Sequence, residues 1–169
     1  MCEKYKLKGL LVGRKDCEIT NLCHKLMDTT NMLKHEELRK SYNQSKFIFL
    51  PNYADASPRV LSEALATNLP VLCNRNILGG WKYVNEKTGV FFTDENDIDS
   101  AIDEMNRKLL NNEFSAREEY IKNYGPVNTG IRLRDFLYDT FGEQINVPRH
   151  KTDYVTIDYP KTDYAKCEL

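Results

Sequence analysis

The chain has 169 residues, a length that fits one domain with a hydrophobic core of its own. Hydrophobic residues make up 41% and charged residues 29%, which is typical of a soluble globular protein, and no apolar run is long enough for a membrane span. With 24 basic and 25 acidic residues, the net charge of -1 gives no bulk attraction for nucleic acid, although local basic groups could bind a phosphate.

The five cysteines and three histidines do not have the spacing of a metal site or of a disulfide framework. The cysteine count is odd, and no C-x-x-C pair occurs. We therefore expect reduced thiols in a cytoplasmic protein that holds no metal ion.

Strands and helices are predicted to alternate from the start of the chain. Residues 7–13 (LKGLLVG) form an apolar run closed by Gly and predict a buried strand. Residues 17–27 have apolar side chains near helical spacing, and residues 30–33 (TNML) predict a short strand. A mostly exposed helix is expected over 34–44.

The middle of the chain contains the clearest strand. Residues 46–51 (KFIFLP) are continuously apolar and stop at a proline, a pattern typical of a strand buried on both faces of a parallel sheet. A helix follows from residue 58, and two further strands are predicted at 70–73 (PVLC) and 89–92 (GVFF).

The remainder is predicted to be helical. One helix is expected over about 95–111, and a second begins after Ser115, which has capping-box spacing to Glu118. A last helix is expected over about 128–142. The sequence KTDY then occurs twice, around a stretch that alternates like an edge strand or forms a loosely held tail.

This order of elements predicts an α/β fold. We expect a single Rossmann-like domain over residues 1–145, with a parallel sheet, helices on both faces and a helical C-terminal part, followed by a tail over 146–169. Such sheets bind ligands outside the carboxyl ends of their strands. The loop 51–57 leaves the carboxyl end of the clearest strand and is therefore placed to contribute to a site.

The start of the helix after this loop is a candidate anion site. Ser57 suits the N-cap and Pro58 the first helical position, so the free amides of Arg59 and Val60 would face a ligand. Arg59 and Glu63 both fall away from the apolar stripe of this helix. They are either an exposed i, i+4 pair or a phosphate-binding cation and a carboxylate for ribose hydroxyls, and Arg59 opposes the helix dipole where it stands.

Two loops carry the other candidates. Asp55 is either a turn residue or an acceptor for sugar hydroxyls. Gly79 and Gly80 either form a simple turn or let the backbone approach a ligand closely. Trp81 and Tyr83, which follow, are expected to be packing residues.

Together these residues resemble a known family. FIFLPNYADASPRVLSEALATNLPVL looks like the core of the C-terminal, donor-binding domain of GT-B glycosyltransferases of the family-four type, also called glycosyl transferases group 1. The signature is an acid, seven residues and a Glu, with Asp55 and Glu63 at the two acidic positions. The helix and strand before it and GG…TGVFF after it are also similar, so the resemblance covers roughly residues 30–110.

The resemblance implies a retaining sugar transfer from a nucleotide-diphosphate donor, without a metal or other cofactor. It places Glu63 at the ribose, Asp55 at the sugar, and Ser57, Arg59 and Val60 around the phosphates, with Gly79 and Gly80 beside them. Arg14 and Lys15 would be the cations that stabilise the leaving diphosphate. Asp55 is one methylene shorter than the Glu that the family has there.

The chain also departs from the family pattern. A GT-B enzyme has two Rossmann-like domains, and we expect only the second here, so the acceptor site would come from another domain or subunit. Residues 7–13 could be either of two family strands, and one strand–helix unit is missing. The tail or a partner chain would have to complete the sheet. Two alternatives stay open: a binding module without transfer activity, or an unrelated flavodoxin-like α/β domain.

Overall fold

A computed structural model describes residues 4–12, 27–30 and 33–142 of the chain. The chain divides into two units, Met1–Gly125 and Pro126–Leu169. The first contains every strand of the described residues and the candidate site, and the second contributes one helix.

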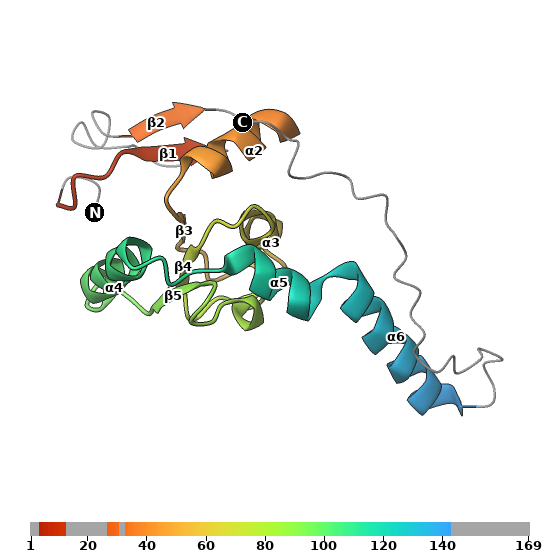
Figure 1. Cartoon of the computed structure of the whole chain (residues 1–169). Helices are drawn as coiled ribbons and strands as arrows, with labels where there is room; N and C mark the ends of the chain where they lie inside the picture. The colour runs from red at the N-terminus through yellow and green to blue at the C-terminus, as the bar shows by residue number, and fades with distance from the viewer. Residues whose placement is uncertain (1–3, 13–26, 31–32, 143–169) are drawn as a thin grey trace. The chain divides into compact units, whose positions relative to one another are not determined.

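A three-stranded parallel sheet is the centre of the first unit (Figure 1). It consists of β3 (Ile48–Leu50), β4 (Val71–Asn74) and β5 (Gly89–Phe92), in the order β3-β4-β5. The predicted strands at 46–51, 70–73 and 89–92 are thereby confirmed. Their runs are apolar on both faces because the sheet is covered on both faces.

Successive residues of β4 pack into different hydrophobic clusters. Val71 and Cys73 pack with α3 (Arg59–Ala66) and α5 (Ala116–Tyr124), together with Tyr42 of α2 (His35–Gln44). Leu72, between them, packs on the opposite face against α4 (Ile98–Leu110). Helices on both faces of a parallel sheet confirm the predicted Rossmann-like α/β domain.

The N-terminal strands form a separate pair. β1 (Gly9–Val12) lies parallel to β2 (Met27–Thr30), with Gly9 opposite Met27. β2 lies three residues before the predicted strand at 30–33, and the helix predicted over 17–27 falls almost entirely outside the described residues. Within the described ranges β3 pairs only with β4. The additional strand that we expected to complete the sheet is therefore not among the described strands.

The helix α5 begins as predicted but is capped differently. Ser115 is the N-cap residue, yet its side chain makes no capping hydrogen bond, so the predicted capping box is wrong. Instead, the backbone N–H of Arg117 donates to Oδ1 of Asn68 at 3.0 Å. A side chain from the end of α3 therefore satisfies a free amide of this helix.

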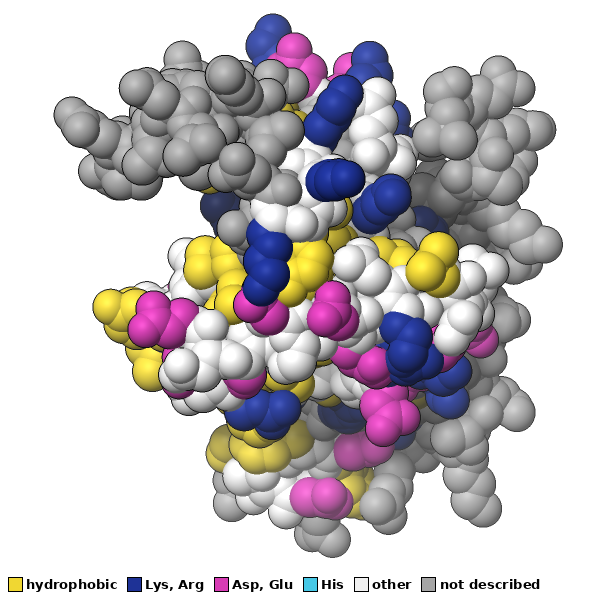
Figure 2. Space-filling view, turned by 90° about the vertical axis from the view of Figure 1, so that its left-hand side faces the viewer, with side chains coloured by type: hydrophobic (Ala, Val, Ile, Leu, Met, Phe, Trp, Pro, Cys, Tyr) yellow, Lys and Arg dark blue, Asp and Glu magenta, His cyan; other side chains and the backbone are white. Residues whose placement is uncertain are grey.

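The second unit contains α6 (Pro126–Phe141), which matches the predicted last helix. The units divide after Gly125, whereas the predicted boundary at 145/146 and the repeated KTDY segments lie outside the described residues. Among the helices described, none is long and apolar enough to cross a membrane. Basic, acidic and apolar side chains are all present on the face of the molecule in Figure 2.

Candidate functional site

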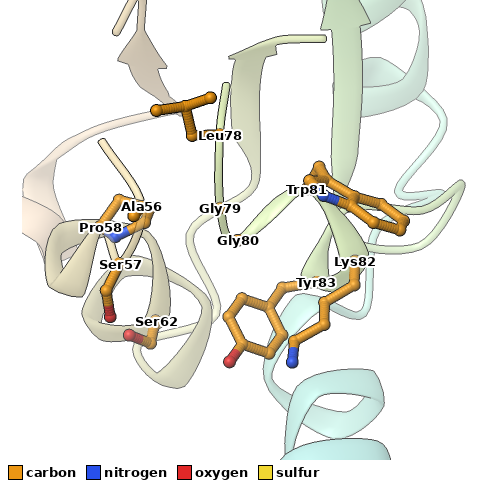
Figure 3. A pocket seen from close by; sticks show the side chains of 10 residues that line it. All are labelled: Ala56, Ser57, Pro58, Ser62, Leu78, Gly79, Gly80, Trp81, Lys82 and Tyr83. Carbon is orange, nitrogen blue, oxygen red and sulfur yellow. The ribbon is translucent and has the colours of Figure 1, made fainter. Parts of the chain in front are cut away.

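A hollow of about 400 Å³ opens where the loops after β3 and β4 meet the beginning of α3 (Figure 3). These loops leave the carboxyl ends of neighbouring parallel strands, which is where α/β sheets bind ligands. The lining residues come from the two loops, the first turns of α3 and a short 3₁₀ helix: Ala56, Ser57, Pro58, Ser62, Leu78, Gly79, Gly80, Trp81, Lys82 and Tyr83.

The two loops are joined by backbone hydrogen bonds. The N–H of Leu78 donates to the carbonyl of Tyr53 at 3.0 Å, and the N–H of Gly79 donates to the carbonyl of Asp55 at 3.0 Å. A Cβ atom at Gly79 would lie 1.8 Å from the carbonyl oxygen of Ala56. Gly79 therefore permits a close approach of the two loops to each other.

Gly80 is required for a different reason. It has a φ of 82°, in the left-handed region that favours glycine, and it precedes the 3₁₀ helix η1 (Trp81–Tyr83). A Cβ atom there would lie 2.8 Å from side-chain atoms of both Pro58 and Leu61. The second glycine therefore turns the chain tightly over the beginning of α3.

The helix α3 begins one residue later than predicted. Its first residue is Arg59 and its N-cap position is occupied by Pro58, so the prediction of Ser57 as N-cap is wrong. The carboxylate of Asp55 accepts a hydrogen bond from the N–H of Ser57 at 2.9 Å. That bond tightens the turn before the helix and leaves the hydroxyl of Ser57 in the lining of the hollow.

The structure separates the predicted site residues into two groups. Ser57, Gly79 and Gly80 line the hollow, and Asp55 is hydrogen-bonded to two of these three. The others do not line it: Arg59 is exposed, Val60 packs against the core and Glu63 faces α2. Arg59 and Glu63 form none of the ion pairs found within the described ranges. Arg14 and Lys15 lie outside the described residues.

Glu63 is held by a buried tyrosine. The hydroxyl of Tyr42, a residue that is 8% exposed, donates to Oε2 of Glu63 at 3.1 Å. Burial raises the pKa of Tyr42 well above its ordinary value, and the negative charge of Glu63 raises it further. The bond joins α2 to α3, and because a carboxylate accepts about four hydrogen bonds, it leaves Glu63 with further acceptor capacity.

Residues 6–125 match the sequence model of a known family, described as glycosyl transferases group 1. The chain belongs to this family. The match ends at the last residue of the first unit, so this unit is the glycosyl transferase domain of the chain. Among curated proteins, no match to the chain was found.

The predicted site of this glycosyl transferase family domain omitted three polar residues that line the hollow: Ser62, Lys82 and Tyr83. The ring of Tyr83 does pack as predicted, at 4.6 Å from the ring centroid of Tyr124. Trp81 does not, since it lines the hollow and is 57% exposed, so its prediction as a packing residue is wrong. The one sequence signal for Lys82 is a cation two residues after a glycine pair.

Proposed function

We propose that the hollow binds the diphosphate part of a nucleotide-sugar donor and that the chain is the donor-binding part of a glycosyltransferase. One observation carries the proposal: in a glycosyl transferase domain, a cavity lies at the carboxyl ends of β3 and β4, beside the beginning of a helix and a glycine pair. Helix N-termini and exposed backbone near glycines favour phosphate groups.

The proposed reaction exchanges one bond at the anomeric carbon of the sugar. The bond from that carbon to the phosphate oxygen breaks, and its electron pair stays on the nucleotide diphosphate. The acceptor hydroxyl oxygen forms the new bond and releases its proton to water. We propose retention of the anomeric configuration, with Arg14 and Lys15 as further cations for the leaving group and no metal ion, as the family resemblance implies.

Asp55 and Glu63 have different support as donor contacts. Asp55 lies in the loop next to the hollow, and the proposal assigns its carboxylate to the sugar although Oδ1 already accepts from Ser57. Glu63 is assigned to the ribose. Its support is a carboxylate fixed in orientation by Tyr42 and able to accept further hydrogen bonds.

A binding module without transfer activity is the second candidate. The described part of the first unit has one Rossmann-like sheet with its two covering layers, whereas the family-type reaction also needs an acceptor site. We propose that a second domain or subunit contributes this site. Family membership argues against the unrelated flavodoxin-like alternative. A cytoplasmic location remains part of the proposal because of the cysteine pattern.

Thermal-shift measurements with UDP- and GDP-sugars test donor binding on the full chain. We expect an increased melting temperature with at least one donor, because a ligand that binds only the folded state stabilises it. Unchanged melting with all of them would contradict the proposal. Donor hydrolysis or sugar transfer by the chain would favour the enzyme over the binding module.

Two variants separate the binding role of Glu63 from its structural role. Glu63→Gln keeps an oxygen that can accept from Tyr42 and removes the negative charge, so it should weaken nucleotide binding with little loss of stability. Tyr42→Phe removes the hydrogen bond from Tyr42 to Glu63 and keeps the carboxylate, so it should lower stability more than it weakens binding. Glu63→Gln binding as tightly as wild type would refute the ribose assignment.

A further inference from the structure

Lys82 provides the charge of the hollow. It is the one Lys, Arg or His among the lining residues that the structure describes, and none of these residues is Asp or Glu. The ion pairs found in the described ranges do not involve it. Arg59, the cation predicted from the sequence, is exposed and does not line the hollow. The charge of this cavity therefore favours an anion and comes from the loop after β4.

The backbone from which Lys82 projects is fixed by neighbouring elements. The carbonyl of Lys82 accepts a hydrogen bond from the hydroxyl of Tyr124 at 2.8 Å, and the N–H of Tyr83 donates to the carbonyl of Gly80 at 2.9 Å. Tyr83 is itself held edge-on by the rings of Tyr120 and Tyr124. α5 thus holds η1 in place, while the side chain of Lys82 remains exposed.

Hydroxyl groups line the same hollow as the ammonium group of Lys82. Figure 3 shows the side chains of Lys82 and Tyr83 extending from η1, with Ser57 on the opposite side of the hollow, at the beginning of α3. The ammonium lies 5.3 Å from the centroid of the Tyr83 ring. Hydroxyl and ammonium groups, in a lining that contains no Asp or Glu, are the set that suits phosphate oxygens, which only accept hydrogen bonds.

We propose that Lys82 binds the phosphates of the donor and neutralises the nucleotide diphosphate that leaves. This inference rests on the proposed function and deepens it. When the anomeric bond breaks, its electron pair stays on the phosphate, so the departing nucleotide diphosphate is more negative than the donor. A nearby cation interacts more strongly with the greater charge, and Lys82 therefore favours the state in which the bond is broken.

The test compares two lysines of the same loop in the full chain by titration calorimetry. Lys82→Gln removes the cation of the hollow, and Lys87→Gln removes an exposed lysine outside the lining. The probes are UDP, UDP-glucose, GDP and GDP-mannose, with uridine and guanosine as ligands without phosphate. We expect Lys82→Gln to lower the affinity for the diphosphates about tenfold, near the loss for one charge-assisted hydrogen bond. Its affinity for the nucleosides should change little.

Further measurements identify the cause of any loss. The loss for Lys82→Gln should be larger for UDP than for UDP-glucose and smaller at high salt, and Lys82→Arg should recover most of the affinity. Equal affinities of Lys82→Gln and Lys87→Gln would overturn the inference and leave the proposed function standing. A wild-type chain that binds none of the diphosphates would overturn both.

Discussion

Replacing Gly79 by alanine should separate the two loops that form the hollow. The added methyl carbon would lie 1.8 Å from the carbonyl oxygen of Ala56, a backbone atom that cannot rotate away. The clash is relieved only if the loops move apart, which breaks the hydrogen bonds Leu78–Tyr53 and Gly79–Asp55. Each contributes about 1 kcal/mol, so we expect a loss of about 2 kcal/mol or more in the free energy of unfolding.

Urea denaturation of the full chain, followed by circular dichroism, measures this loss from the shift of the midpoint at constant slope. Gly130→Ala is the matched control, because a Cβ atom at Gly130 meets no atom within 4 Å and this residue lies inside α6. There alanine should be neutral or stabilising by up to about 1 kcal/mol, since its helix propensity is higher than that of glycine. A Gly79→Ala chain within about 0.5 kcal/mol of wild type would refute the steric reasoning.

Three further predictions concern the core. Met105→Ala should lower the free energy of unfolding by about 2–5 kcal/mol because Met105 is fully buried. Leu110→Ala, at an 82% exposed residue of the same helix, should lower it by less than about 0.5 kcal/mol. Equal losses in urea denaturation would contradict this. The raised pKa of Tyr42 keeps it protonated in the folded state, while the unfolded residue ionises near pH 10. Its contribution to stability should therefore be complete below pH 10 and decline above it, and Tyr42→Phe should flatten that decline in denaturation series from pH 9 to 11. Burial raises the pKa of the Cys73 thiol to about 11, so peptide mass spectrometry should find Cys73 unmodified by iodoacetamide at pH 8 until urea unfolds the chain; rapid native labelling would contradict its burial.

The sheet and its covering helices could be predicted because their signals are local. β5 (Gly89–Phe92) has the predicted bounds, and α2 (His35–Gln44) begins one residue late. The strand β2 (Met27–Thr30) could not be predicted, because three of its four residues (MDTT) are polar and the segment shows no strand periodicity. Its backbone pairs with β1, and that pairing depends on a segment that lies far away in the sequence.

The location of the hollow was predictable, but the contacts of the residues around it were not. The loops at the carboxyl ends of β3 and β4 follow from the order of parallel strands. Position 79 needs a glycine because the carbonyl of Ala56 leaves no room for a Cβ atom. The side chain that caps α5 is Asn68, from the end of α3. Each partner lies more than twenty residues away in the sequence, where spacing patterns carry no information.

The helix α3 illustrates the limit of periodicity at a predicted site residue, Glu63. The predicted apolar stripe is confirmed, since Leu61, Ala64 and Leu65 are fully buried and Val60 packs against them. The same periodicity placed Glu63 away from that stripe, and an exposed carboxylate needs no partner. A neighbouring helix nevertheless places the hydroxyl of Tyr42 against Glu63. One carboxylate thus joins two helices while keeping acceptor capacity for a ligand, so only variants that separate these roles, Glu63→Gln and Tyr42→Phe, can assign it to binding.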